Sequence, residues 1–137
     1  MYRNKYFEGE PHDIKQLEEL IHILRDKEHG CSWDSVQTHE TLKKCLLDET
    51  NEVVQAIDNE DDNNLCEELG DVLLQVLLHA EIAKERGAFS LDDVLNVLGD
   101  KLVRRHPHIF GDEPRPDTPE EALAMWNKIK KMEKERK

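Results

Sequence analysis

Two pairs of acidic residues are the feature of this sequence best suited to chemistry. Glu49 and Glu52 are three positions apart, and so are Glu68 and Asp71. In a helix, this spacing places both side chains of a pair on one face, about a turn apart. Four carboxylates that converge would repel one another unless cations neutralised them. If the two helices are neighbours, the pattern therefore predicts a site for Mg²⁺ or a similar hard divalent metal.

The alternative is that these acids are solvated surface residues, because 31 of the 137 residues are acidic. Two observations favour a site. Both pairs interrupt apolar segments, and the connection between their predicted helices is short, which is typical of antiparallel neighbours. A ferritin-like di-iron centre is not expected, because it needs two Glu-x-x-His motifs and the sequence offers one, Glu19-x-x-His22.

Basic and aromatic residues form a second group with chemical potential. Lys101 and Arg105 are four positions apart near the end of a predicted helix. Trp126 and Lys130 show the same spacing in the last helix. Cations at a helix C-terminus are common for dipole reasons alone, and a tryptophan at helical spacing also suits a core. Together with Trp33 in a polar loop, these side chains suit a metal-bound polyphosphate that carries an aromatic base.

The elements that must position these residues are predicted to be helices. Apolar residues repeat at helical spacing, and glycine, proline and β-branched runs are too sparse for an all-β fold. We expect an all-α single domain over 1–137, with a four-helix-bundle-like core completed by oligomerisation. An N-terminal extension covers 1–12, and a charged tail over 131–137 should fray. The five expected helices lie at about 13–27, 39–58, 65–86, 90–105 and from 118 to that tail.

The expectation of an oligomer comes from the third of these helices. Its segment 69–83 is apolar on most of its circumference. A helix of that kind is buried on both sides, which one layer of helices in a chain of 137 residues does not provide. His79 within it is expected to be a hydrogen-bonded core residue.

The composition bears on partners and compartment. The net charge is -12, which repels the phosphates of duplex nucleic acid, although a bound cation reverses the sign locally for a nucleotide. No apolar run approaches the roughly 20 residues of a transmembrane helix, and the first ten residues hold no secretory signal. Three cysteines without a CxxC pair suggest reduced thiols. We therefore expect a cytoplasmic protein that binds neither duplex nucleic acid nor membrane.

An ordered series of short motifs runs through residues 14–133. It comprises CSWD at 31–34, QTHE at 37–40, LLDETNEV at 46–53, EELGD at 67–71, LLQV at 73–76, HA at 79–80, KLVRRHPH at 101–108 and W-x-x-x-K at 126–130. The series resembles the MazG family of nucleotide pyrophosphohydrolases. The resemblance implies an all-α fold that forms homodimers or homotetramers. It also implies hydrolysis of nucleoside triphosphates to the monophosphate and pyrophosphate with Mg²⁺, for which Mn²⁺ is a possible substitute.

The resemblance also assigns roles to residues. The family's acidic ligands, which would serve both metal binding and catalysis, correspond to Glu49, Glu52, Glu68 and Asp71. Its basic and aromatic nucleotide contacts correspond to Lys101, Arg105, Trp126 and Lys130, with Trp33 as a further candidate. Ser32, Asp48 and Asn51 depart from the usual motifs. Asp48 leaves the set of acidic ligands intact, and the preferred base stays open.

The sequence thus predicts a Mg²⁺-dependent nucleoside triphosphate pyrophosphohydrolase acting on ribo- or deoxyribonucleotides. The number of metal ions, the general base and the choice between dimer and tetramer stay open. A dUTP or phosphoribosyl-ATP pyrophosphatase is the alternative within the same fold. From a different class, a catalytically silent helical oligomer that binds nucleotide or a protein partner is possible. Retention of four acids favours an enzyme, because a scaffold would not need them.

Overall fold

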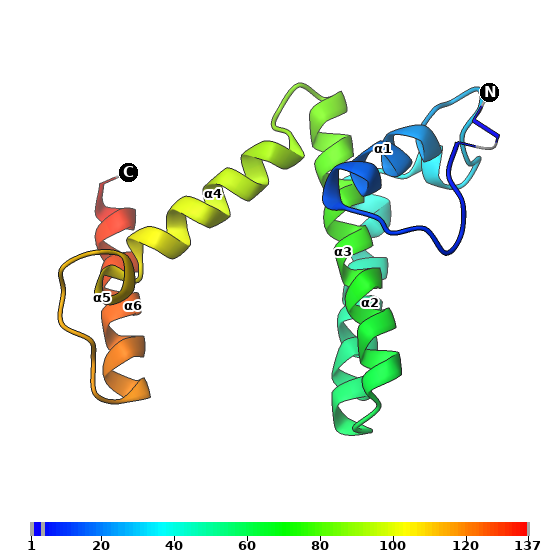
Figure 1. Cartoon of the computed structure of the whole chain (residues 1–137). Coiled ribbons are helices and arrows are strands. Elements are labelled where there is room, and N and C mark those ends of the chain that lie inside the picture. The colour runs from blue at the N-terminus through cyan, green and yellow to red at the C-terminus, as the bar shows by residue number, and fades with distance from the viewer. Residues whose placement is uncertain (1, 4, 137) are drawn as a thin grey trace. The chain divides into compact units, whose positions relative to one another are not determined.

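The computed structural model describes residues 2–3 and 5–136, and every regular element among them is helical (Figure 1). The predicted all-α class is confirmed. The chain divides into two compact units, 1–91 and 92–137. The elements are α1 (Ile14–Leu24), the 3₁₀ turn η1 (Asp34–Val36), α2 (His39–Asp58), α3 (Asp62–Glu85), α4 (Leu91–Arg104), α5 (Pro107–Phe110) and α6 (Pro119–Glu135).

In the first unit, α2 and α3 form an antiparallel hairpin, and α1 packs against α3 (Figure 1). Thr38 caps α2 by accepting a hydrogen bond from the Thr41 amide, and Asp61 caps α3 through the Asn64 amide. The three residues between the helices turn sharply at Glu60, whose φ is 51°. A turn this short keeps the end of α2 close to the start of α3, so the two helices pack side by side.

The core of this unit lies where its three helices meet. Its buried members are Ile21, Leu42, Leu77, Leu78, Ala80, Ile82 and Leu91. These residues belong mostly to the C-terminal half of α3. The N-terminal half of α3 carries the acidic pair and lies beside α2, whereas α1 and most of the core residues of α3 lie at its C-terminal half (Figure 1). The acidic pair is therefore outside this core.

Arg25 ties the loop before α2 to the end of α3. Its Nε and Nη2 atoms donate to the Glu85 carboxylate at 2.6 and 2.9 Å. Its Nη1 atom donates to the carbonyl oxygens of Asp34 and Gln37 at 2.7 and 2.8 Å. The guanidinium therefore replaces water as the partner of two loop carbonyls. It sets the position of the loop that carries Trp33.

The N-terminal extension contacts α1 and the segment after it. The Tyr2 hydroxyl donates to the Asp26 carboxylate at 2.9 Å, and Lys5 forms an ion pair with Glu19. Both contacts are exposed or half-buried, so each adds little stability by itself. None of the helices in the described part of the chain is long and apolar enough to cross a membrane.

The second unit consists mainly of α4, with about four turns, and α6, with about five turns, and α5 lies between them in the sequence. The short α5 lies in the segment expected to be a connector, and Pro107 begins it because proline suits the first helical position. Thr118 caps α6 as its sequence indicates, and the helix continues to Glu135, into the segment expected to fray. Within the described residues the structure therefore has six α-helices, whereas the sequence predicts five.

Large apolar side chains remain uncovered on α2 and α3. On α3, Leu69, Leu73 and Val76 are 52%, 38% and 39% exposed. On α2, Leu47 and Ile57 are also exposed. Large exposed apolar side chains on two neighbouring helices are candidates for a site of association. The described residues therefore bury one side of α3, whereas the sequence pattern predicts burial on both.

Candidate functional site

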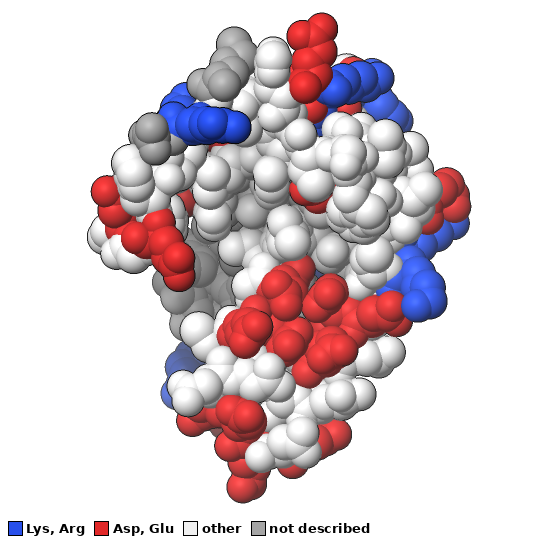
Figure 2. Space-filling model, turned by 90° about the vertical axis from the view of Figure 1, so that its right-hand side faces the viewer, with Lys and Arg blue, Asp and Glu red and all other residues white. Residues whose placement is uncertain are grey.

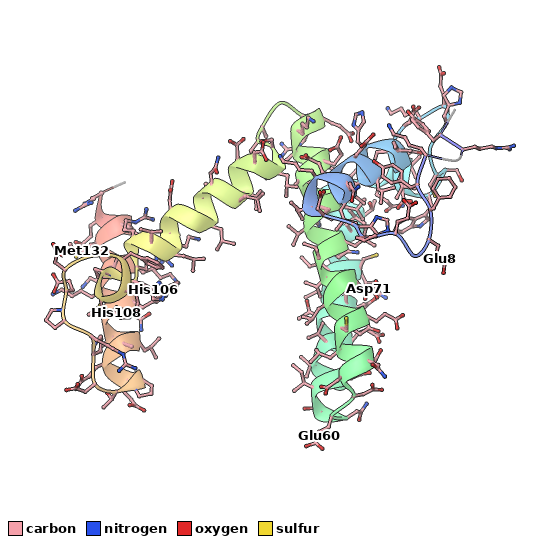
Figure 3. All side chains as sticks on the ribbon, viewed as in Figure 1. Glu8, Glu60, Asp71, His106, His108 and Met132 are labelled. Atoms are coloured by element: carbon pink, nitrogen blue, oxygen red, sulfur yellow. The ribbon has the colours of Figure 1, made fainter. Side chains whose placement is uncertain are left out.

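The α2–α3 hairpin brings the predicted acids together. Glu49, Glu68 and Asp71 each offer a carboxylate oxygen, and these oxygens lie within 4.8 Å of one another. Each pair shares a helical face, and the antiparallel packing turns the two faces toward each other. Figure 3 labels Asp71 on α3, and in Figure 2 acidic side chains gather in a patch near the middle of the face shown.

Burial and mutual repulsion both act on this cluster. Desolvation raises the pKa of Glu49, and the charges of Asp71, Glu52 and Asp48 raise it further, against the opposing effect of a hydrogen bond with Glu68. Glu68 is buried, and desolvation followed by the charge of Glu52 raises its pKa as well. Both shifts show that the ionised cluster is unfavourable on its own. A cation would relieve the repulsion.

Glu52 is exposed and stands outside the group of three, but its charge reaches both Glu49 and Glu68. The structure therefore groups three of the four predicted acids and places the fourth within electrostatic reach. All donors in the set are carboxylate oxygens, without a histidine or thiol. That donor chemistry fits a hard divalent metal such as Mg²⁺ and argues against zinc.

The second unit contains a basic cleft of about 260 Å³. It is lined by Val97, Lys101, Arg104, Arg105, Lys130, Glu133 and Lys134. Three of these residues are among the predicted nucleotide contacts: Lys101 and Arg105 belong to α4 and its end, and Lys130 belongs to α6. Five cations and one carboxylate therefore surround the cleft, in a chain whose net charge is -12. Such a concentration of positive charge is suited to a polyanion.

Trp126 contacts Arg105, a residue that lines this cleft, and His106. The Cζ atom of Arg105 lies 4.7 Å from the centroid of the indole ring. The His106 ring meets the same indole edge to face, with the centroids 5.4 Å apart. In Figure 3, His106 and His108 lie close together, and their ring centroids are 5.6 Å apart. The indole is therefore half-buried between cationic and aromatic neighbours.

Comparison with known proteins decides the family. Residues 37–110 match the MazG nucleotide pyrophosphohydrolase domain. The chain belongs to the MazG family. A chain described as a mazG-related protein from Thermotoga maritima has a crystal structure similar to this one, with a TM-score of 0.64 and 32% identity, over 83% of this chain and 98% of that chain.

Curated MazG relatives are similar over most of this chain. The nucleoside triphosphate pyrophosphohydrolase/pyrophosphatase MazG of Thermotoga maritima is 51% identical over 124 residues, 88% of this chain and 46% of that protein. The nucleoside triphosphate pyrophosphohydrolase of Escherichia coli K12 is 43% identical over 127 residues, 90% of this chain and 48% of that protein. The chain spans about half the length of these relatives.

Trp33, the remaining predicted contact of this MazG chain, belongs to the first unit, whereas the basic cleft belongs to the second. Trp33 immediately precedes η1 and is 51% exposed. The Gln37 side-chain amide donates to its carbonyl oxygen at 2.9 Å. This bond and Arg25 hold the backbone of the loop and leave the indole available to solvent.

The nucleotide contacts predicted from the sequence do not include three charged residues that line the basic cleft, Arg104, Glu133 and Lys134. The signal was present, because Glu133 follows Lys130 by three positions and Lys134 follows it by four, which places all three on one helical face. Because 131–137 is expected to fray, the sequence pattern assigns no role to Glu133 and Lys134.

His79 is a hydrogen-bonded residue, as predicted: its Nδ1 atom lies 2.8 Å from Nδ1 of His39, and the two rings are stacked.

Proposed function

We propose that this chain is a nucleoside triphosphate pyrophosphohydrolase, which hydrolyses ribo- or deoxyribonucleoside triphosphates to the monophosphate and pyrophosphate with Mg²⁺, or with Mn²⁺ as a substitute. The observation that carries the proposal is the convergence of Glu49, Glu68 and Asp71 on the α2–α3 hairpin. Relatives that share about half of its residues over most of its length bear the name of this activity. A catalytically silent binder would not need carboxylates placed so close together that each makes ionisation of the others less favourable.

The carboxylates of Glu49, Glu68 and Asp71 would hold the metal, with Glu52 at their edge. When bound, Mg²⁺ neutralises phosphate charge and lowers the pKa of a coordinated water. The three acids also supply the negative charge that compensates the ion, and the antiparallel packing of α2 on α3 keeps them at a fixed spacing.

Glu52 is the acid best suited to accept the proton of the attacking water. It is exposed and does not belong to the group of three, so one carboxylate is left for acid–base work. The water oxygen attacks the α-phosphorus in line and its proton passes to Glu52. The bond from the α-phosphorus to the bridging oxygen breaks, and pyrophosphate leaves with the electron pair.

The basic cleft supports the phosphate part of the proposal. Lys101, Arg105 and Lys130 would neutralise the negative charge of the phosphates, including the charge that grows on the leaving pyrophosphate. Trp126 and Trp33 are the aromatic residues proposed to contact the base. Of the two, Trp33 exposes its ring, whereas Trp126 is held beneath Arg105.

A second copy of this chain is the proposed partner, in a homodimer or homotetramer. The exposed apolar side chains of α2 and α3 would lie in that interface, because association removes them from water. A cytoplasmic location and the absence of duplex-nucleic-acid and membrane binding stay predictions from the sequence. Sedimentation equilibrium at micromolar protein tests the assembly, and a mass of 16.0 kDa, that of one chain, would contradict it.

The activity is tested by release of pyrophosphate from a panel of ribo- and deoxyribonucleoside triphosphates, with dUTP and phosphoribosyl-ATP included. Each substrate is assayed with Mg²⁺, with Mn²⁺ and with EDTA. We expect pyrophosphate and the monophosphate in equal amounts, and none with EDTA. A folded, metal-bound protein that hydrolyses no member of the panel would instead support the silent binding module.

A further inference from the structure

Glu133 on α6 bridges two arginines at the end of α4. Its Oε1 atom accepts a hydrogen bond from Nε of Arg104 at 2.5 Å, and its Oε2 atom accepts one from Nη2 of Arg105 at 2.8 Å. Longer contacts of 3.3 and 3.4 Å join both oxygens to Nε of Arg105. It is the one acid among the residues that line the basic cleft. A single carboxylate therefore connects α6 to both guanidinium groups.

The bridge uses only part of the hydrogen-bonding capacity of the arginines. A guanidinium has five N–H donors in a rigid planar arrangement. Glu133 takes the Nε–Nη2 edge of Arg105 and the Nε of Arg104. Among the described residues, Nη1 of Arg105 and both terminal nitrogens of Arg104 have no hydrogen-bond partner. These donors are left for a ligand in the cleft.

Two contacts fix the plane and the position of the Arg105 guanidinium. The Trp126 ring lies on one side, 4.7 Å from Cζ, and the Glu133 carboxylate holds one edge. The Arg105 side chain is 9% exposed and that of Glu133 is 18% exposed, so both are shielded from most of the solvent. Hydrogen bonds from Arg105 and Arg104 lower the pKa of Glu133 to about 2, which keeps the carboxylate ionised throughout the physiological range.

We propose that Glu133 is a positioning residue of the basic cleft, whose carboxylate fixes the Arg105 guanidinium against Trp126 so that its remaining donors, with those of Arg104, meet the phosphates of the substrate. This inference rests on the proposed function, in that the ligand of the cleft is taken to be a polyphosphate. A preformed arrangement favours binding, because a flexible arginine side chain would otherwise lose rotamer freedom when the ligand arrives.

Two explanations of polyanion binding in the cleft, net charge and positioning by Glu133, predict opposite effects of removing the Glu133 charge. This difference makes the inference testable. Replacement of Glu133 by glutamine leaves the cleft with five cations and no carboxylate. A more positive cleft should bind a polyanion more tightly if net charge is what matters. If Glu133 acts by positioning, binding should weaken although the charge becomes more favourable.

The probe is inorganic tripolyphosphate, titrated calorimetrically into the full chain at fixed ionic strength. We expect Glu133→Gln to weaken its binding about tenfold and Glu133→Asp, which keeps the charge on a shorter side chain, to weaken it less. Glu135→Gln is the matched control, because it makes the same change in charge on the exposed surface of α6 and should leave the affinity within about twofold.

Two further readouts separate positioning from general damage. With an active nucleotide substrate, Glu133→Gln should raise KM about tenfold and change kcat little, whereas a loss of folding would lower the active fraction and therefore kcat. In a Trp33→Phe background, Trp126 fluorescence should change in Glu133→Gln and stay the same in Glu135→Gln, because the guanidinium leaves the indole face.

Tripolyphosphate binding by a folded Glu133→Gln chain as tight as that of the wild type, or tighter, would overturn the inference. If Glu133→Gln does not fold, Glu133→Asp decides, and an unchanged affinity in that variant overturns the inference equally. A wild type that releases no pyrophosphate from any nucleotide, but whose tripolyphosphate affinity falls in Glu133→Gln, would refute the proposed function and leave the role of Glu133 supported.

Discussion

The acidic hairpin and the basic cleft are both clusters of like charge, but they are stabilised differently. The charges that raise the pKa values of Glu49 and Glu68 all belong to other carboxylates. In the basic cleft, by contrast, Glu133 has a pKa lowered to about 2 because Arg105 and Arg104 surround it. The acidic cluster would therefore need a cation from outside the chain to neutralise it, whereas the basic cleft contains a carboxylate of its own.

This difference has consequences for how each region meets a ligand. If a metal binds there as proposed, the acidic hairpin would gain stability, since the repulsion among its carboxylates would be relieved. The basic cleft can be ordered beforehand, because a carboxylate already holds its arginines in place. On this proposal, a metal completes the acidic hairpin, whereas the side chains of the basic cleft are already arranged before the polyphosphate binds.

Removal of one acid from the hairpin should have the largest effect. We expect Glu49→Gln and Asp71→Asn each to lower the rate of pyrophosphate release by several powers of ten, because each removes a charge that holds the metal, and every tenfold loss is about 1.4 kcal/mol of transition-state stabilisation. Glu40→Gln, an exposed change of the same kind at the start of α2, should retain wild-type activity. Release at the wild-type rate by folded Glu49→Gln would refute the assignment of the acidic site.

Metal binding at the acidic hairpin should raise the free energy of unfolding of the chain. Binding to the native state alone raises the free energy of unfolding by ~2.7 kcal/mol at a hundredfold excess of ligand over Kd. Melting curves with EDTA and with Mg²⁺ measure this effect, and Asp71→Asn should reduce it. In EDTA the same variant should melt no lower than the wild type, since like-charge repulsion is relieved. An identical midpoint with and without saturating Mg²⁺ would speak against the metal site.

A change in the basic cleft should have a smaller effect than one in the hairpin. Lys101→Ala removes one of several cations, so we expect KM to rise about tenfold, equivalent to about 1.4 kcal/mol, with a smaller fall in kcat. Steady-state kinetics separate the two constants. Lys27→Ala, at an exposed position in the first unit, is the control. A loss of kcat as large as that of Glu49→Gln would show that the two regions do not differ in the way described.

The smallest effect concerns the other end of the hairpin, where His79 is stacked on His39. Desolvation, followed by the charge of His39, lowers the pKa of His79. The unfolded chain then binds more protons as the pH falls below about 6.5, so the free energy of unfolding should decrease, by at most about 1.4 kcal/mol per pH unit for one proton. Urea denaturation between pH 7.5 and 5.5 in EDTA measures this slope.

His79→Phe should flatten that slope, because phenylalanine keeps a ring against His39 and binds no proton. His12→Gln, at an exposed position before α1, should leave the slope unchanged. A slope that persists in His79→Phe would assign it to another group.

The boundaries of the helices follow closely from local sequence signals. The predicted range 39–58 coincides with α2, because Thr38 is a strong cap and the cap is a local interaction. The structure begins α3 at Asp62, three residues before the predicted start at 65, because Asp61 caps the helix within an acidic, asparagine-rich segment. The sequence pattern predicts no helix at α5, but Pro107 begins a short helix there, because proline suits the first helical position.

Sequence by itself determined which acids share a helical face, because a spacing of three is a property of the helix alone. Only the tertiary structure decided that Glu49 meets Glu68 and Asp71 within 4.8 Å, since this depends on how α2 packs on α3. The same holds for Glu133 and Arg105, which are 28 positions apart along the chain. Helical periodicity places residues within one element, but the partner of a charged side chain is set by packing between elements, which no spacing rule contains.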